Sequence, residues 1–150
     1  MNNLGNIELP EIVQKILAKT EEIGFPMVSE PLVGYLLRTL VASKISGYFL
    51  ELGTGTGIAT GWILDGMDAQ SKLLTVENDP ALIDIAWEYL GEDKRIIFHV
   101  GDGADFMEKL NSQEEQFDLI FADTWAGKYT HLNEAIQVLK PGGLYVIDDM

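Results

Sequence analysis

The sequence predicts an α/β fold in which a doubly wound parallel sheet carries helices on both faces. Short apolar runs recur from residue 48 onward, and segments with the apolar spacing of helices lie between them. Strands that alternate with helices form right-handed βαβ units, which build parallel sheets. The length agrees with this prediction, because 150 residues, 47% of them hydrophobic, suffice for one domain with a sizeable core.

Two helices are expected before the first strand. Residues 10–24 begin with a proline and end with a glycine, and apolar residues recur between them. A second helix has Ser29 as its candidate N-cap and Pro31 in its first turn. We therefore predict that residues 1–46 form an N-terminal helical cap and that residues 47–150 form the α/β core of a single domain.

The predicted strands end in carboxylates or in glycine turns. They cover residues 48–52, 73–78, 96–100, 117–123 and 144–149, with helical patterns at 82–89 and 132–139. In open α/β sheets, ligands bind beyond the carboxyl ends of the strands. The ends in this chain carry, in order, the stretch ELGTGTG, Glu77, the stretch GDGAD, Asp123, and Asp148 with Asp149. We expect a ligand site along this edge.

Composition limits the partners. The net charge of −14, from 10 basic and 24 acidic residues, repels nucleic acid phosphates and predicts no nucleic acid partner. No apolar run approaches the length that spans a membrane, so no membrane partner is expected. The chain has no cysteine and does not begin with a basic segment followed by an apolar one. These features predict a cytoplasmic location.

The stretch ELGTGTG is the strongest local signal. Its glycines permit positive φ angles and close approach of a ligand to the backbone. The dinucleotide fingerprint G-x-G-x-x-G, counted from Gly53, would need a glycine at position 58, where the chain has Ile58. This favours a nucleoside ligand without a pyrophosphate. Glu77 lies 24 residues after Gly53 and can accept hydrogen bonds from ribose hydroxyls.

The ends of the fourth and fifth strands predict a metal site. Neighbouring strands lie about 4.8 Å apart, so Asp123 and Asp148 can converge. Oxygen ligands suit Mg²⁺, Ca²⁺ or Mn²⁺. Successive strand residues point to opposite faces, so Asp149 can join Asp148 only if the strand has already ended. The alternative is an acidic cluster that a helix N-terminus stabilises.

In this order, ELGTGTG, the acid in VEND, GDGAD and LKPGG resemble the class I S-adenosylmethionine-dependent methyltransferases. The stretches FPMVSEPLVGYLLRTLV and FADTWAGKYTHLNEAIQVLKPGGLYVIDDM are similar to the O-methyltransferases of the catechol and caffeoyl-CoA type, particularly small bacterial members. The resemblance covers nearly all of residues 25–150. It implies a Rossmann-like methyltransferase fold, S-adenosylmethionine as cofactor, and methyl transfer to a hydroxyl of a small, catechol-like acceptor.

The resemblance also implies site residues. Its cofactor positions are Met27, Val28, Glu51, Gly53, Thr54, Gly55, Gly57, Glu77, Asp102, Gly103 and Asp123. The glycine loop would wrap the methionine part, Glu77 would hold the ribose, and Asp102 with Gly103 would flank the adenine. Met27 and Val28 match a segment that closes over the cofactor. The family's metal positions correspond to Asp123, Asp148 and Asp149, for Mg²⁺ or another divalent cation.

The chain departs from the family pattern in two places. The family usually has a lysine as general base three residues after the aspartate at position 123, whereas this chain has Ala126. Lys128 is the nearest candidate base, and together with Asp123 it forms the expected catalytic set; the alternative is a surface lysine. Trp125 is a candidate platform for an aromatic acceptor, or a lid or core residue. Family members continue beyond a fifth strand, so the chain is expected to be truncated there.

Three alternatives stay open beside the methyltransferase. A cofactor-binding module that has lost transferase activity would agree with Ala126 and with the expected truncation. An RNA methyltransferase is disfavoured by the acidic composition. A nicotinamide oxidoreductase is disfavoured by the missing third fingerprint glycine. The resemblance further implies a homodimer as a candidate assembly, with the N-terminal helices as its interface.

Overall fold

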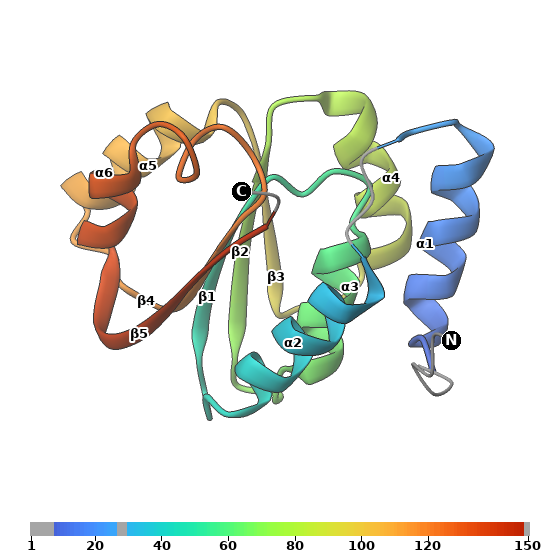
Figure 1. The fold of residues 1–150 in the computed structure, drawn as a ribbon, viewed down its shortest axis with the longest axis horizontal. Coiled ribbons are helices and arrows are strands. Elements are labelled where there is room, and N and C mark those ends of the chain that lie inside the picture. Colours follow the sequence, from blue (N-terminus) through green and yellow to red (C-terminus); the bar gives the residue numbers. More distant parts are fainter. Residues whose placement is uncertain (1–7, 27–29, 149–150) are drawn as a thin grey trace, which may run out of the picture.

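A computed structural model describes residues 8–26 and 30–148. The strands form one parallel sheet with the order β3-β2-β1-β4-β5, and helices cover both of its faces (Figure 1). The strands are β1 (Tyr48–Leu52), β2 (Lys72–Glu77), β3 (Ile96–Val100), β4 (Phe117–Ala122) and β5 (Leu139–Ile147). The doubly wound α/β prediction is confirmed.

Six helices lie on the two faces within the described ranges. They are α1 (Glu11–Glu22), α2 (Pro31–Ala42), α3 (Ile58–Gly66), α4 (Pro80–Leu90), α5 (Gly103–Ser112) and α6 (Leu132–Gln137). Helices α1 to α4 cover one face, and α5 and α6 cover the other (Figure 1). Each face has its own apolar cluster, because side chains alternate along a strand: Phe49 belongs to the first cluster and Leu50 to the second.

The two N-terminal helices are part of the first apolar cluster. Ile16 on α1 and Leu37 on α2 are fully buried in it together with Phe49 of the sheet. A Cβ at Gly34 of α2 would lie 2.3 Å from the Trp62 indole, so glycine there lets α2 pack closely against α3. Helices α1 and α2 of the predicted cap therefore share a core with the sheet, and the domain boundary stays a prediction.

Two local predictions need correction or qualification. The N-cap of α2 is Glu30, while Ser29 lies outside the described residues. Strand β5 begins at Leu139, not at residue 144, so the LKPGG stretch lies inside the strand. The pairing of Phe117 with Leu139, followed by a register shift, accounts for this early start. The ion pair of 2.9 Å between Lys140 and Asp118 holds the added segment against β4.

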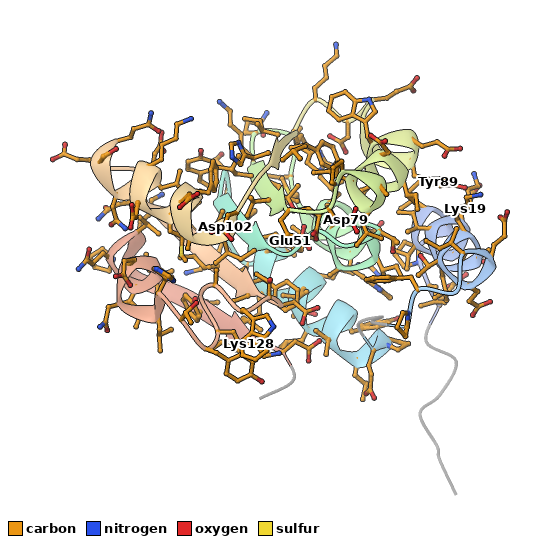
Figure 2. The ribbon with its side chains drawn as sticks, turned by 90° about the horizontal axis from the view of Figure 1, so that it is seen from above. Lys19, Glu51, Asp79, Tyr89, Asp102 and Lys128 are labelled. Carbon is orange, nitrogen blue, oxygen red and sulfur yellow. The ribbon has the colours of Figure 1, made fainter. Side chains whose placement is uncertain are left out.

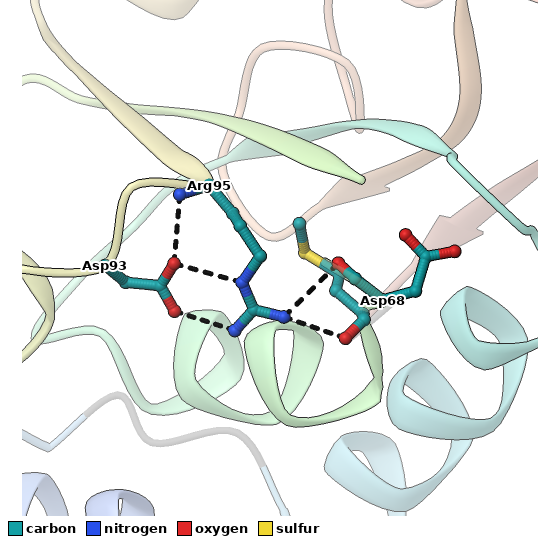
Figure 3. A network of polar contacts seen from close by, with 4 residues as sticks. Asp68, Asp93 and Arg95 are labelled. Carbon is teal, nitrogen blue, oxygen red and sulfur yellow. Dashed lines mark hydrogen bonds and ion pairs between the residues drawn. The ribbon is translucent and has the colours of Figure 1, made fainter. Parts of the chain in front are cut away.

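The amino-terminal side of the sheet is held by a polar network (Figure 3). The Arg95 guanidinium donates to the Asp93 carboxylate at 2.7 and 3.0 Å and to the Met67 carbonyl at 2.7 Å. The Asp68 carboxylate accepts from the Ser46 amide at 2.7 Å. These bonds tie together the turns before β1 and β3 and the end of α3, away from the carboxyl ends of the strands.

The sheet order places the switch point between β1 and β4. The chain leaves β1 toward α3 on one face and reaches β4 from α5 on the other. The Asp123 amide donates to the Leu52 carbonyl at 2.9 Å, so the loops that follow β1 and β4 begin side by side. No helix within the described ranges is long and apolar enough to cross a membrane.

Candidate functional site

Two adjoining cavities lie at the carboxyl edge of the sheet, the edge that faces the viewer in Figure 2. The first has a volume of about 230 Å³ and lies beside the glycine loop, α3 and the start of α4. The second has a volume of about 220 Å³ and lies between the loop after β3 and the loop after β4. Both are lined by Gly53, Glu77, Asn78 and Thr124. The two cavities therefore form one groove across the ends of β2, β1 and β4.

The glycine loop follows β1 and has the backbone that its glycines predict. Gly53, Gly55 and Gly57 have φ angles of +98°, +54° and +97°. A Cβ at Gly57 would lie 3.1 Å from the side chains of Ala86 and Leu90, so glycine here also lets α4 approach. The loop therefore uses its glycines both for positive φ and for close packing.

The threonines of the loop bind other parts of the protein. Thr54 and Thr56 are 4% and 3% exposed. The Thr54 hydroxyl lies 2.6 Å from the Thr75 hydroxyl on β2. The Thr56 hydroxyl lies within hydrogen-bond distance, 2.8 Å, of the Thr20 hydroxyl on α1. Sequence reasoning did not identify Thr20. The available signal was its position one turn after Ile16, where a polar residue interrupts the apolar face of the helix.

Glu51 lies below the loop and lines neither cavity. Its carboxyl is fully buried and accepts from the hydroxyls of Thr60 at 2.7 Å and Thr75 at 2.6 Å. Burial raises the pKa of Glu51 to about 8; the two hydrogen bonds oppose this shift, and the charges of Asp123 and Glu77 add to it. Glu51 is therefore a neutral acid at pH 7, and its Oε1 has no partner among the described residues.

Glu77 ends β2 and contributes to both cavities. Its Oε2 accepts from the Gly55 amide at 2.8 Å, and its Oε1 accepts from the amides of Asn78 and Asp79 at 2.9 and 3.1 Å. These bonds hold the carboxylate at the mouth of the groove. A carboxylate oxygen can accept two hydrogen bonds, so Oε1 is filled by its two amides and Oε2 keeps a lone pair for a ligand hydroxyl.

The second cavity contains the predicted residues of the GDGAD stretch. Asp102 caps α5 through Oδ1, which accepts from the amides of Ala104 at 2.8 Å and Asp105 at 3.2 Å. Asp102, Gly103, Trp125 and Ala126 line this cavity, and a Cβ at Gly103 would lie 3.2 Å from that of Ala126. The structure thus brings Asp102 and Gly103 to the same groove as Glu77.

The first cavity adds residues that the sequence did not single out. Phe25, which follows α1, contributes to its wall, and a Cβ at Gly55 would lie 3.8 Å from the Phe25 ring. Met27 and Val28, the predicted closing segment, lie outside the described residues. Phe25 could have been predicted as a site residue from its place two residues before this segment.

The loop after β4 is held mainly by its own backbone. The Trp125 carbonyl accepts from the amides of Lys128, Tyr129 and Thr130 at 3.3, 2.9 and 3.0 Å. From β5, the Tyr145 hydroxyl donates to the Gly127 carbonyl at 2.6 Å. The Lys128 ammonium lies 5.3 Å from the centre of the Tyr129 ring, and Lys128 lines neither cavity. Its catalytic role stays a prediction.

The structure brings two of the three predicted metal ligands to adjacent positions. Ala122 pairs with Ile147 across β4 and β5, so Asp123 and Asp148 follow at equivalent places on neighbouring strands. Asp149 lies outside the described residues. Carboxylates of this kind are the donors that a hard divalent cation prefers. Within residues 8–26 and 30–148, no three acidic, histidine or cysteine residues group closely enough to hold a metal ion.

Comparison with known proteins gives a consistent result. One family model, described as O-methyltransferase, matches residues 6–150. A Mycobacterium leprae protein, whose own O-methyltransferase assignment is provisional, is 30% identical over 95% of this chain and 65% of its own. A catechol O-methyltransferase from Niastella koreensis is 29% identical over 86% of this chain and 61% of its own. The chain thus spans less than two thirds of the length of these curated relatives.

A solved structure shares the fold. The O-methyltransferase from Bacillus cereus in complex with SAH has a TM-score of 0.85 at 22% identity, over 97% of this chain and 69% of that one. At this level of identity the likeness supports the arrangement of the sheet and helices.

Proposed function

This chain belongs to the O-methyltransferase family, and we propose that it binds S-adenosylmethionine in the groove and transfers its methyl group to a hydroxyl of a small molecule. The observation that carries this proposal is the position of Glu77. Its carboxylate lies where the two cavities meet and lines both of them. A ribose hydroxyl that donates to the free lone pair of Glu77 Oε2 would place one arm of the nucleoside in each cavity.

In this pose the methionine arm occupies the first cavity. Ile58 and Ala59, the first residues of α3, line that cavity, and the N-cap Gly57 offers no side chain to the helix end. The first amides of a helix have no partner within the helix, and its dipole favours an anion there. The carboxylate of the methionine arm therefore fits the start of α3.

The adenine fits the second cavity. Asp102, Gly103 and Trp125 all line it. The aromatic face of Trp125 can pack against a base, and the N-cap geometry of Asp102 keeps its own part of the wall in place. This assignment carries over the predicted roles of Asp102 and Gly103 and adds Trp125 to them.

The transfer itself is a displacement at the methyl carbon. A lone pair of the acceptor oxygen forms the new O–C bond while the C–S bond of the sulfonium breaks, and the hydroxyl proton leaves the acceptor. Asp123 lines the first cavity, and in this proposal it would orient the acceptor. Asp123 and Asp148, with Asp149, would hold a divalent cation, which would lower the pKa of the acceptor hydroxyl when bound. Lys128 is the proposed base, and a catechol-like molecule is the proposed acceptor.

One observation favours a second function, a cofactor-binding module without transferase activity. Ala126 occupies the position of the family's usual lysine, is 7% exposed, and lines the second cavity with a methyl group. A chain with this residue can bind the cofactor without the usual base. Turnover of a panel of catechols separates the two functions, because a binding module would bind the cofactor and leave every acceptor unchanged. A homodimer, a cytoplasmic location and the absence of a nucleic acid partner stay predictions.

The test is a calorimetric titration of S-adenosylhomocysteine into the chain, with and without Mg²⁺. We expect micromolar binding, which Glu77→Gln weakens about 50-fold because each charged hydrogen bond contributes about 1.5–3 kcal/mol. The matched control is Glu108→Gln on the exposed face of α5, which should bind normally. A wild-type affinity in Glu77→Gln would contradict the proposed pose, and no binding by the unmodified chain would contradict the function.

A further inference from the structure

Three hydrogen bonds that involve side chains tether the glycine loop, one at each of its central residues, beside the backbone bonds from Gly53 and Thr54 to the Val76 carbonyl. The Thr54 hydroxyl is bonded to Thr75 on β2, and the Gly55 amide donates to Glu77 at the end of β2. The Thr56 hydroxyl is bonded to Thr20. The first two tethers belong to the strand next to β1, whereas the third comes from α1, outside the sheet and 36 residues away in sequence. The third tether can therefore be removed without changing the sheet.

The Thr20 side chain is held in place by burial and by hydrogen bonds. Its side chain is fully buried on the inner face of α1. Its hydroxyl donates to the Ile16 carbonyl at 2.7 Å and lies 2.8 Å from the Thr56 hydroxyl, from which it can accept. The bond to Ile16 fixes the rotamer of Thr20, because a threonine in a helix commonly bonds the carbonyl one turn earlier. The hydroxyl is thus held in the direction of the loop.

Helix α1 is itself held firmly enough to position the loop. Val13 and Ile16 are buried in the first apolar cluster. A Cβ at Gly61 of α3 would lie 3.0 Å from the Val13 side chain, so α1 approaches α3 closely. The chain that leaves α1 then places Phe25 in the wall of the first cavity. The end of α1 therefore contacts the loop twice, through Thr20 and through Phe25.

From these contacts we propose that Thr20 is a positioning residue for the cofactor, and that its bond to Thr56 holds the glycine loop in the binding conformation. The inference rests on the proposed function. A loop with three positive-φ glycines has many conformations when it is free, and ordering it on binding reduces affinity. A tether that orders the loop beforehand removes part of that cost. The N-terminal helix is accordingly part of the cofactor site and not only a cap.

The test compares cofactor affinity with stability in matched variants. Thr20→Val keeps the shape and removes the hydroxyl, and we expect its dissociation constant for S-adenosylhomocysteine to rise about fivefold, the equivalent of one hydrogen bond of about 1 kcal/mol. Thr20→Ser restores the hydroxyl and should bind within twofold of wild type. Ile16→Val, one turn earlier on the same helix, should lower the melting temperature and leave the affinity unchanged.

Two further variants complete the design. Thr39→Val on α2 removes an exposed hydroxyl that also donates to a carbonyl one turn earlier. This variant should change neither the affinity for S-adenosylhomocysteine nor the melting temperature. Thr56→Val removes the same hydrogen bond as Thr20→Val, from the loop side. The double variant Thr20→Val/Thr56→Val should therefore bind S-adenosylhomocysteine no more weakly than the weaker-binding single variant does. Normal affinity in Thr20→Val, or an equal loss in Ile16→Val, would overturn the inference and leave the proposed function standing. No binding by the unmodified chain would overturn both.

Discussion

The loops that follow β1 and β4 begin side by side and face the same groove, but they are held by different means. The loop after β1 sends its threonine side chains into the protein, where Thr75 and Thr20 bind them. The loop after β4 is closed by its own carbonyl at Trp125, which also accepts from the Thr130 hydroxyl, and by the Tyr145 hydroxyl from β5. Its aromatic residues Trp125 and Tyr129 stay 73% and 55% exposed.

This difference agrees with two kinds of ligand. A loop whose side chains are bonded into the core is ordered before binding and suits a ligand that never varies, such as a cofactor. A loop that rests on its own backbone can be remodelled while the sheet remains intact, and its exposed Tyr129 ring, which lines neither cavity, offers apolar surface to a varying acceptor. We infer that the loop after β1 binds the cofactor alone, whereas the loop after β4 contacts the cofactor through Trp125 and the acceptor through Tyr129.

The largest effect is expected where the two loops touch. A Cβ at Gly53 would lie 3.1 Å from the Asp123 carbonyl and 3.2 Å from Thr124, and the residue has a φ of +98°. Gly53→Ala should lower the free energy of unfolding by about 3–4 kcal/mol, from backbone strain and from crowding. Urea denaturation measures this loss. Gly142→Ala has a similar φ of +79° with no atom within 4 Å, so it should cost only the strain.

The second effect concerns the buried acid below the first loop. The pKa of Glu51 is raised from 4.5 to about 8, so between these values the folded chain keeps a proton that the unfolded chain has released. Stability therefore falls as the pH rises through this window, by up to ~1.4 kcal/mol per pH unit. Glutamine cannot ionise, so Glu51→Gln lacks this loss. The free energy of unfolding of the variant minus that of wild type should therefore increase by about 3 kcal/mol from pH 5 to pH 8.

Denaturation of both proteins at several pH values gives the difference directly. Titrations of all other groups cancel in the comparison, because the two chains differ at one residue. A difference that stays constant from pH 5 to pH 8 would show that Glu51 ionises normally, and the neutral acid below the loop would have to be abandoned.

A smaller effect is expected from the Tyr145 hydroxyl, which bonds the loop after β4 from the neighbouring strand β5. Burial raises the pKa of Tyr145 to about 12, so its hydroxyl stays protonated and donates to Gly127 at neutral pH. Tyr145→Phe should cost about 1 kcal/mol of stability. It should also speed amide hydrogen exchange in residues 128–130. The control is Tyr35→Phe on α2, which should leave this exchange unchanged; equal protection in Tyr145→Phe would mean that the backbone alone holds the loop.

The smallest change in stability is expected at the exposed rings. Trp125→Ala should alter the free energy of unfolding by no more than about 0.5 kcal/mol. Because Trp125 lines the second cavity, the same variant should weaken binding of S-adenosylhomocysteine about fivefold. Tyr129 lines neither cavity, so Tyr129→Ala should bind normally. The same weakening in both variants would assign the effect to the loop as a whole and not to the Trp125 ring.

Much of the fold and part of the site could be predicted from the sequence alone. Strands, helices and their alternation follow from apolar spacing, since a buried face imposes its period on nearby residues. Glu77 and Asp123 could be placed at one edge because parallel strands end on the same side. The positive φ angles of the ELGTGTG glycines were likewise predictable, because few other residues adopt them.

Only the tertiary structure decided how distant segments meet. The bond between Thr20 and Thr56 joins residues 36 positions apart, and no pattern in the sequence pairs them. The bond forms because α1 packs against α3 and α4. The same holds for Phe25 in the cavity wall and for the early start of β5, where pairing with β4 outweighs the proline and glycines of LKPGG. Local chemistry determined the elements and the acids at their ends, whereas packing determined which hydroxyls and rings surround them.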